Sequence, residues 1–363
     1  MYTAFLERTQ RSIEAVKRHI ATSEVFRSAI HDGALICKSE TPCFSQLLLS
    51  VEAAPDRIEW RVIDHCAAVT RIYAIYEQFA QEMIREHLSL LQVHIAFADL
   101  PERLKTSYRR GLAAILEKKE GPRYGHLNLP ALIAQYDRAL SGNPYVLEPL
   151  ALLMQEQNLR LPELMRLFAD CGIADVDMWI EKHSTIRAFF AKHGRVGASA
   201  EHEMAELIKY RNDAAHGSIS VDELPGLDYL FEFCDFVSAI CEALSERAQL
   251  TGLDCLIDCG SAAQRGTVNE CIKSGLVLIG EVAGKFTVGD TIYLCGHDYC
   301  VQRDILSLQI EGVDHTKVSL TQPTQLGFAI NKPGRKKARV IMINPLPLAN
   351  ANTIPESNEV SQI

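Results

Sequence analysis

The sequence predicts two structural classes in one chain: an all-α region followed by a small antiparallel β-barrel or sandwich. Apolar residues recur at three- and four-residue spacings from Tyr2 to about residue 250, with almost no alternating runs, and this is the period of helices. After Gly252 the pattern changes to short β-branched runs separated by turn residues, which is typical of strands. A length of 363 residues suits about two domains.

The helices expected in the first region are separated by residues that end helices. They cover residues 3–28, 56–91, 104–118, 129–140, 161–168, 176–192, 199–215 and 227–249. Glycines such as Gly172 and Gly217 stand where the periodicity breaks. The helix at 56–91 carries a long apolar stripe that includes Ile63, Tyr73 and Tyr76, and we expect this stripe to be buried.

The strands expected in the second region follow six apolar runs. These runs are 275–282, 286–294, 305–310, 315–320, 326–330 and 338–343. The pair Gly289 and Asp290 and the segment 332–334 supply turns between them. We therefore predict a helical domain over 1–249, a barrel over 250–346 and a loose, polar tail over 347–363.

Composition limits the possible classes of protein. The values exclude a disordered chain, a collagen and a small disulfide scaffold. The longest apolar stretches, such as 149–154, fall far short of the roughly 20 residues that cross a bilayer, so we expect no membrane contact. The N-terminal segment is charged and lacks the features of a secretory signal, which predicts a cytoplasmic location. A net charge of −9 means that nucleic acid would need a local basic patch.

Eleven cysteines are spread along the chain, mostly inside apolar runs, and this favours buried, reduced thiols. One group could instead hold zinc, although no pair within it has the two-residue spacing of a zinc knuckle. Its members are Cys255, Cys259, Cys295, His297 and Cys300. Both interpretations remain open.

A cluster of polar residues at the end of the helix at 199–215 carries the candidate chemistry. It contains Arg211, Asn212, Asp213 and His216, directly before Gly217. An arginine and a histidine can cleave RNA without a metal or cofactor. The ribose 2′-hydroxyl attacks the neighbouring phosphorus, the imidazole moves protons, and the guanidinium stabilises the charge on the phosphoryl oxygens.

The spacing of Arg211 and His216 is a weak signal by itself. Five residues place the two side chains about 140° apart on an ideal helix. Either the helix ends before His216, or a second subunit completes the site. Alternatively, Arg211 pairs with a carboxylate and His216 caps helix carbonyls.

The segment LIKYRNDAAHG resembles the Arg-x4–6-His signature of the HEPN superfamily, and VTRIYAIYEQFAQEMIREHL resembles the first core helix of its RiboL-PSP-type branch. The resemblance implies a helical bundle that pairs about a two-fold axis and acts as a metal-independent endoribonuclease leaving cyclic-phosphate ends. It implies that Arg211 stabilises the transition state, that His216 is a general acid/base or orients the substrate, and that Asn212 orients the phosphate or the partner subunit's histidine. Asp213 and Glu77 are less specific members of the candidate site. For each of them, a solvated or ion-pair role is the alternative.

The segment GEVAGKFTVGDTIYL and the runs after it resemble the second-domain barrel of translation elongation and initiation GTPases. The chain departs from that pattern in the inserted LCGHDYC and in a basic final turn. It has no Gly-x4-Gly-Lys-Ser/Thr loop, so GTP hydrolysis is not implied and the barrel is expected to be a binding module.

Two basic segments are candidates for contacts with RNA phosphates. The first, which we term the basic turn, consists of Lys332, Arg335, Lys336, Lys337 and Arg339, without an intervening acid. The second includes Arg109 and Arg110 beside Tyr108, where bases could stack. A solvated hairpin tip and a solvated helix face are the respective alternatives.

Together these observations predict a cytoplasmic, homodimeric, metal-independent endoribonuclease. By analogy with the two families, we expect a toxin or antiphage effector that acts on tRNA or another translation RNA, with an antitoxin or regulatory protein as a candidate partner. The alternatives are a non-catalytic, antitoxin-like binding module and a ribosome-associated factor.

Overall fold

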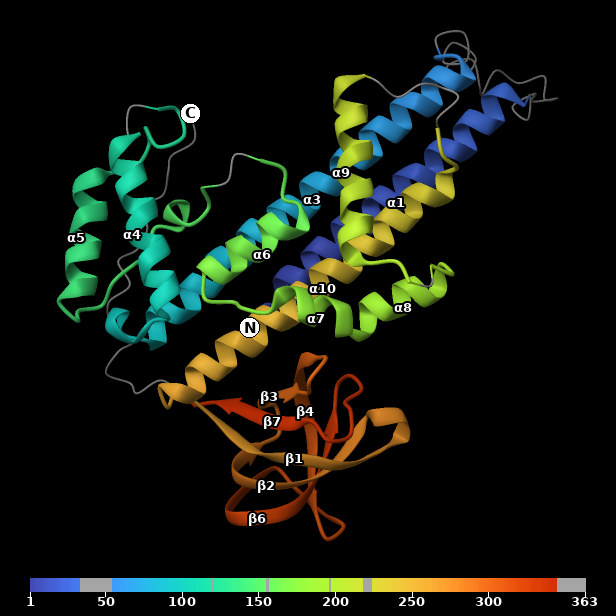
Figure 1. Cartoon of the computed structure of the whole chain (residues 1–363). Helices are drawn as coiled ribbons and strands as arrows, with labels where there is room; N and C mark the ends of the chain where they lie inside the picture. The colour runs from blue at the N-terminus through green and yellow to red at the C-terminus, as the bar shows by residue number, and fades with distance from the viewer. Residues whose placement is uncertain (33–53, 119–120, 155–156, 196, 218–223, 345–363) are drawn as a thin grey trace, which may run out of the picture. The chain divides into compact units, whose positions relative to one another are not determined.

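The structure, a computed structural model, describes residues 1–32, 54–118, 121–154, 157–195, 197–217 and 224–344. The chain divides into two compact units. The first reaches Gln249, and the second begins at Leu250 and also includes residues 93–95. Figure 1 shows the helices of the first unit and the β-strands of the second. The tail predicted at 347–363 lies outside the described residues. The predicted fold class, helical and then β-barrel, is confirmed.

The described helices follow the predicted order. They are α1 (Thr3–His31), α3 (Arg57–His94), α4 (Glu102–Glu117), α5 (Leu129–Leu140), α6 (Leu161–Asp170), α7 (Val176–Lys182), α8 (Ser184–Lys192), α9 (Ala200–His216) and α10 (Leu227–Asp258), with 3-10 turns at Phe97–Asp99 and Pro149–Ala151. Two differences from the predicted bounds are large. The helix expected at 176–192 is broken at His183, whose side chain caps α8 by accepting from the Thr185 backbone N–H at 3.3 Å. Helix α10 continues past residue 249 to Asp258.

Helix α3 carries a long buried face. Its buried face includes Tyr73, Tyr76 and Phe79, each at most 1% exposed. Ile63 was expected in the same stripe but is 55% exposed. The neighbouring inward position belongs to Asp64, whose Oδ2 accepts from Ser23 Oγ at 2.6 Å and Arg27 Nη1 at 2.8 Å, so the start of the stripe is polar.

Helix α9 has a defined beginning and end. The Ser199 hydroxyl accepts from the His202 backbone N–H at 3.2 Å, which satisfies a free donor of the first turn. At the other end Gly217 adopts φ 67°, a left-handed conformation that glycine takes without strain. The helix is therefore continuous through both Arg211 and His216.

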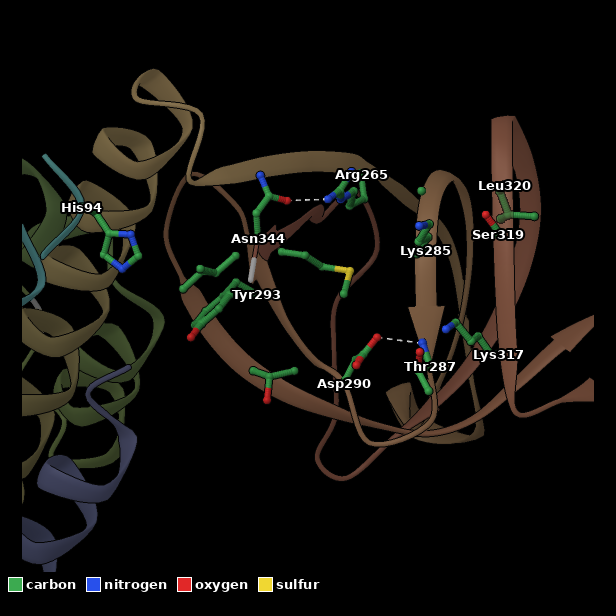
Figure 2. A pocket seen from close by; sticks show the side chains of 14 residues that line it. His94, Arg265, Lys285, Thr287, Asp290, Tyr293, Lys317, Ser319, Leu320 and Asn344 are labelled. Atoms are coloured by element: carbon green, nitrogen blue, oxygen red, sulfur yellow. Dashed lines mark hydrogen bonds between the residues drawn. The ribbon is translucent and has the colours of Figure 1, made fainter. Parts of the chain in front are cut away.

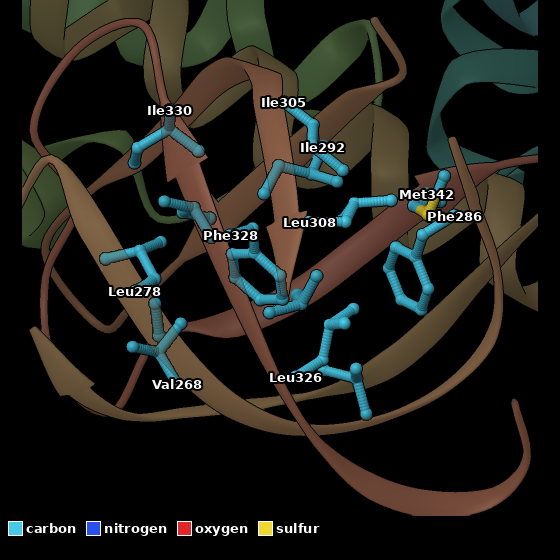
Figure 3. Packing of buried hydrophobic residues seen from close by; sticks show 14 of the residues in the cluster. Val268, Leu278, Phe286, Ile292, Ile305, Leu308, Leu326, Phe328, Ile330 and Met342 are labelled. Atoms are coloured by element: carbon cyan, nitrogen blue, oxygen red, sulfur yellow. The ribbon is translucent and has the colours of Figure 1, made fainter. Parts of the chain in front are cut away.

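The second unit contains strands β1 (Ala262–Ile272), β2 (Val277–Thr287), β3 (Thr291–Cys295), β4 (Cys300–Ile310), β5 (Val313–His315), β6 (Lys317–Ile330) and β7 (Arg339–Ile343). All pairs are antiparallel, in the order β3-β7-β1-β2-β6-β4, and pairing of β3 with β4 closes the barrel. Strand β5 pairs with residues 308–310 of β4. Phe286, Leu308, Leu326 and Phe328 fill the interior (Figure 3).

Several strands differ from the sequence prediction, and β1 and β6 differ most. Strand β1 was not predicted, because AAQRGTVNECI is polar and only Ala262 and Val268 on it are buried. The runs expected at 315–320 and 326–330 form one long strand, β6, which pairs with β2 on both sides of an irregularity at Gly284. Within the described residues, no helix combines the length and apolar character needed to cross a membrane.

Candidate active site

The guanidinium of Arg211 is fixed by groups from three parts of the helical unit. Its Nη1 donates to Asn212 Oδ1 at 3.0 Å and to Asn158 Oδ1 at 3.3 Å. Asn158 Nδ2 in turn donates to Asn212 Oδ1 at 3.2 Å, which closes a triangle of hydrogen bonds. Cζ of Arg211 lies 4.9 Å from the ring centroid of Tyr73 on α3, within the range of a cation–π contact. The orientation of the guanidinium is therefore set from α3, α9 and the segment before α6.

Tyr73 and Tyr76 hold that segment in place. The Tyr73 hydroxyl accepts from the Leu159 backbone N–H at 2.8 Å. The Tyr76 hydroxyl donates to the Leu159 carbonyl at 2.9 Å. Both peptide groups of a fully buried residue are thereby satisfied by α3. Asn158, the residue before Leu159, is consequently held beside Arg211.

Glu77 lies one helical turn after Tyr73 and faces the same cluster. Burial raises the pKa of the Glu77 carboxyl above its usual value, while Arg211 and a hydrogen bond from Tyr73 act in the opposite direction. The carboxyl and the guanidinium are thus close enough to interact electrostatically. The sequence named Glu77 as a less specific candidate, with a solvated or ion-pair role as the alternative, and its carboxyl lies near the Arg211 guanidinium.

His216 does not join this cluster within one chain. It is exposed in the last turn of α9, whereas Arg211 is half-buried. Because α9 is continuous through both residues, their side chains leave the helix about 140° apart. Of the two alternatives for this spacing, the one in which the helix ends before His216 is wrong. Asp213 is half-buried on the same helix.

Two arginines of the predicted basic turn lie close to other side chains. Cζ of Arg335 lies 4.5 Å from the centroid of the Tyr299 ring, and its Nη1 lies 3.7 Å from a carboxylate oxygen of Asp298. Arg339 Nη2 lies 3.6 Å from Asp254 Oδ1. Lys336 and Lys337 are exposed.

The predicted basic pair on α4 is divided between two environments. Arg109 Nη2 donates to Glu102 Oε1 at 3.0 Å on the surface of the helix. Arg110 lines a pocket together with Arg166 and Asp170. The two arginines therefore have different neighbours.

The candidate zinc residues are dispersed. Cys295 and Cys300 face each other on β3 and β4, with sulfurs 3.0 Å apart, and both are fully buried. His297 is 85% exposed and contacts Asp298, while Cys255 and Cys259 lie near the end of α10. Among the described residues, no three His, Cys, Asp or Glu side chains converge as metal ligands.

Two residues of the cluster were not predicted from the sequence. Tyr73 was placed in the apolar stripe, and only its position one turn before Glu77 hints at a shared face. Asn158 precedes α6 outside any regular element and carries no periodic signal. Its role depends on a contact with residues more than fifty positions later in the chain.

Comparison with solved structures finds partial likenesses. Two are crystal structures of the C-terminal domain of a putative U32 peptidase from Geobacillus thermoleovorans, one of them a selenomethionine variant. Each is 13% identical to this chain, with a TM-score of 0.20. The first match covers 23% of this chain and 92% of the other chain. The selenomethionine variant covers 22% of this chain and 98% of its own. At that TM-score they support no inference. No match is found among curated proteins.

Comparison with protein families gives a match to the helical unit. The model of the RiboL-PSP-HEPN family matches residues 39–249, which is more than half of the chain. The match includes the helices that carry Tyr73, Glu77, Arg211 and His216. The chain belongs to the RiboL-PSP-HEPN family.

Proposed function

We propose that this chain is a metal-independent endoribonuclease. Family membership suggests an RNA-related function. The observation that carries the proposal is the fixed guanidinium of Arg211, held by Asn158, Asn212 and the ring of Tyr73. A cation with a preset orientation stabilises charge on phosphoryl oxygens without reorganising during the reaction.

In the proposed reaction, the ribose 2′-oxygen forms a bond to the adjacent phosphorus while the bond from phosphorus to the 5′-oxygen breaks. His216 accepts the proton of the 2′-hydroxyl and returns a proton to the leaving 5′-oxygen. Arg211 stabilises the negative charge on the non-bridging oxygens. The products are a 2′,3′-cyclic phosphate and a 5′-hydroxyl end.

The separation of Arg211 and His216 on α9 supports a cleft made by two copies of the chain. In a two-fold dimer, each cleft takes the guanidinium of one copy and the imidazole of the other. Exposure of His216 supports this arrangement, because its ring is accessible to a partner. We assign Asn212 to orienting the guanidinium, and Asp213 and Glu77 to the electrostatic surroundings of the cleft.

The biological role follows only from analogy. We propose a toxin or antiphage effector that acts on tRNA or another translation RNA, with the barrel positioning the substrate. The contacts predicted at Arg109, Arg110 and the basic turn stay predictions.

The test is cleavage of total RNA by the purified chain in excess chelator, with the new ends mapped. We expect cyclic-phosphate ends and loss of at least about a hundredfold in rate for Arg211→Ala and His216→Ala. His202→Ala is the matched control, since His202 is an exposed histidine in the first turn of the same helix. Equal cleavage by all variants, or dependence on added metal, would contradict the proposal.

A non-catalytic binding module is the second candidate, favoured by the intramolecular contacts that already occupy Arg211. It predicts that Arg211→Ala lowers the unfolding free energy and that no preparation cleaves RNA. Binding of a partner protein without cleavage would support it.

A further inference from the structure

The barrel carries a cavity whose lining is rich in cations. We term it the β2–β6 cavity, after two of the strands that border it. Arg265, Lys285, Thr287, Lys317, Ser319 and Asn344 line it (Figure 2). These residues were not part of either basic segment that the sequence predicted to bind RNA.

The two lysines lie side by side on neighbouring strands. Lys285 pairs with Ser319 and Thr287 pairs with Lys317 in the β2–β6 register. The lysines are therefore diagonal neighbours on one face of the sheet. Both are exposed, whereas Phe286 between Lys285 and Thr287 is buried in the barrel interior.

Neither lysine is neutralised within the described part of the chain. No described carboxylate forms an ion pair with Lys285 or Lys317. Two like charges on neighbouring strands repel each other. A bound anion would relieve that repulsion.

The third cation, Arg265, is held at the edge of the cavity by a specific arrangement. Its Nη2 donates to Asn344 Oδ1 at 2.7 Å. Its Nε is buried and has no acceptor among the described residues. Gly284 faces it at an irregularity of β2 with φ 119°, and a Cβ there would lie 3.1 Å from Arg265 Nη1. The absence of a side chain at Gly284 makes room for the guanidinium.

The charge balance of the cavity favours anions. Asp290 is the carboxylate among the barrel residues that line it. Its Oδ2 accepts from the Thr287 backbone N–H at 2.7 Å, so this carboxylate is already used in the turn. Three cations against one engaged carboxylate leave an excess of positive charge. Hydroxyls of Thr287 and Ser319 add neutral groups that can donate to phosphate oxygens.

We propose that the β2–β6 cavity binds phosphate groups of RNA. The proposal rests on the proposed ribonuclease function for the identity of the polymer. Two exposed lysines and an arginine on neighbouring strands suit consecutive phosphates of an open strand, and Arg suits bidentate contact with one of them.

This site differs in position from the basic turn. Gly334 of that turn donates through its backbone N–H to the Gly275 carbonyl, just before β2 begins. The cavity lies where β2 ends, at residues 284–287. Arg335 and Arg339 of the turn already lie near carboxylates, whereas the cavity lysines form no such pair with described residues. The cavity is therefore the better phosphate site on the barrel.

The experiment measures binding of a labelled single-stranded RNA to the full chain carrying Arg211→Ala, so that cleavage does not interfere. Dissociation constants are measured over a range of salt concentrations for that background and for the same chain with Lys285→Gln and Lys317→Gln. We expect affinity to fall on the order of tenfold near 0.1 M salt, and the salt slope to fall by about 0.7 for each lysine removed. Lys273→Gln is the control, because Lys273 is exposed beyond the other end of β2.

An unchanged slope for the double variant, or an equal loss with Lys273→Gln, would overturn the site. Displacement of the RNA by micromolar pyrophosphate would also overturn it, since the cavity would then hold a small phosphate ligand. If the wild-type chain cleaves RNA but the double variant binds RNA with full affinity, only this inference is refuted. A chain that loses affinity as expected but never cleaves RNA supports this inference and refutes the proposed nuclease function.

Discussion

The guanidinium of Arg211 lies over the ring of Tyr73, with Cζ 4.9 Å from the ring centroid. The same tyrosine accepts a hydrogen bond from the buried Leu159 N–H through its hydroxyl. One side chain of α3 therefore places both the candidate catalytic cation and the segment that carries Asn158. Its ring and its hydroxyl serve separate purposes, and substitutions can separate them.

Tyr73→Phe keeps the ring and removes the hydroxyl. Because the Leu159 N–H would be left without its partner, we expect the free energy of unfolding to fall by about 1–3 kcal/mol. Urea denaturation followed by circular dichroism measures this loss. Tyr136→Phe is the control, since the Tyr136 ring packs against Phe97 and Tyr108 and its hydroxyl forms no hydrogen bond with the described residues. A loss of the same size in both variants would mean that the Tyr73 hydroxyl has no special role.

Asn158 is a positioning residue in the proposed mechanism, because it acts on RNA through Arg211. Asn158→Ala removes one acceptor of Nη1 and the link to Asn212. A small displacement of the guanidinium would lower kcat by about ten- to a hundredfold, with little change in KM. Asn158→Asp keeps the acceptor and should retain more activity. Asn143→Ala, at an exposed loop position, should leave kcat unchanged. A rise in KM at constant kcat would instead assign Asn158 to substrate binding.

Glu77 predicts a pH-dependent effect on stability. Its pKa is raised in the folded chain, with burial as the largest cause. A raised pKa means that its stabilising contribution is complete below the unfolded pKa and is lost as pH rises through the folded pKa. Glu77→Gln should therefore unfold at higher urea than the wild type at pH 7.5, and the difference should vanish under acidic conditions. Glu86→Gln, exposed on the same helix, should show no such trend. A Glu77→Gln chain that is less stable at pH 7.5 would contradict this expectation.

For His87 we expect the opposite dependence of stability on pH. Burial lowers its pKa to about 4, and its Nδ1 lies 3.1 Å from the Tyr2 hydroxyl. The unfolded chain takes up a proton at His87 near pH 6.5, whereas the folded chain does so only near pH 4. The contribution of His87 to the unfolding free energy is therefore complete above pH 6.5. It is lost as pH falls toward 4, which lowers the unfolding free energy by on the order of 3 kcal/mol.

His87→Gln tests this dependence. The glutamine keeps an acceptor for Tyr2 but cannot titrate in this range, so unfolding free energies between pH 7 and pH 4.5 should fall less steeply than in the wild type. His65, whose pKa is also lowered to about 4, still contributes in that variant. Equal slopes would show that His87 takes up its proton similarly in both states.

The helices, the strands and the Arg-x4-His motif were predictable where residues close together in the sequence determine them. Gly217 ends α9 because its left-handed conformation suits glycine, and Gly289 with Asp290 forms the turn before β3. The break at His183 was not predictable from periodicity, because a single residue in an extended conformation leaves the apolar spacing intact. Strand β1 was missed because it gains its place by pairing with β2 and β7 rather than by its own composition.

The candidate site was only half predictable for the same reason. Arg211, Asn212 and His216 share one short segment, so their chemistry could be inferred from spacing and residue type. Asn158 enters through hydrogen bonds over more than fifty positions. The cations of the β2–β6 cavity come from three strands, and only the register places Lys285 next to Lys317. Such contacts depend on tertiary structure, which a single sequence does not specify at this level.

The proposed shared cleft predicts complementation between two inactive variants. If each cleft combines Arg211 of one copy with His216 of the other, a heterodimer of Arg211→Ala and His216→Ala chains contains one cleft that lacks both groups and one that is intact. After equal mixing and full subunit exchange, half of the dimers are mixed, so activity should recover to about a quarter of the wild-type value.

The matched control mixes the wild type with the double variant Arg211→Ala/His216→Ala. In a shared cleft, the mixed dimers of this control have no intact site, so only the wild-type dimers, about a quarter of the total, cleave RNA. If each cleft belonged to one chain, half of the wild-type activity would remain, and the two single variants would not restore each other. Because the two arrangements predict different activities in both mixtures, one pair of rate measurements decides whether the exposed imidazole of His216 acts with its own Arg211 or with that of a second copy.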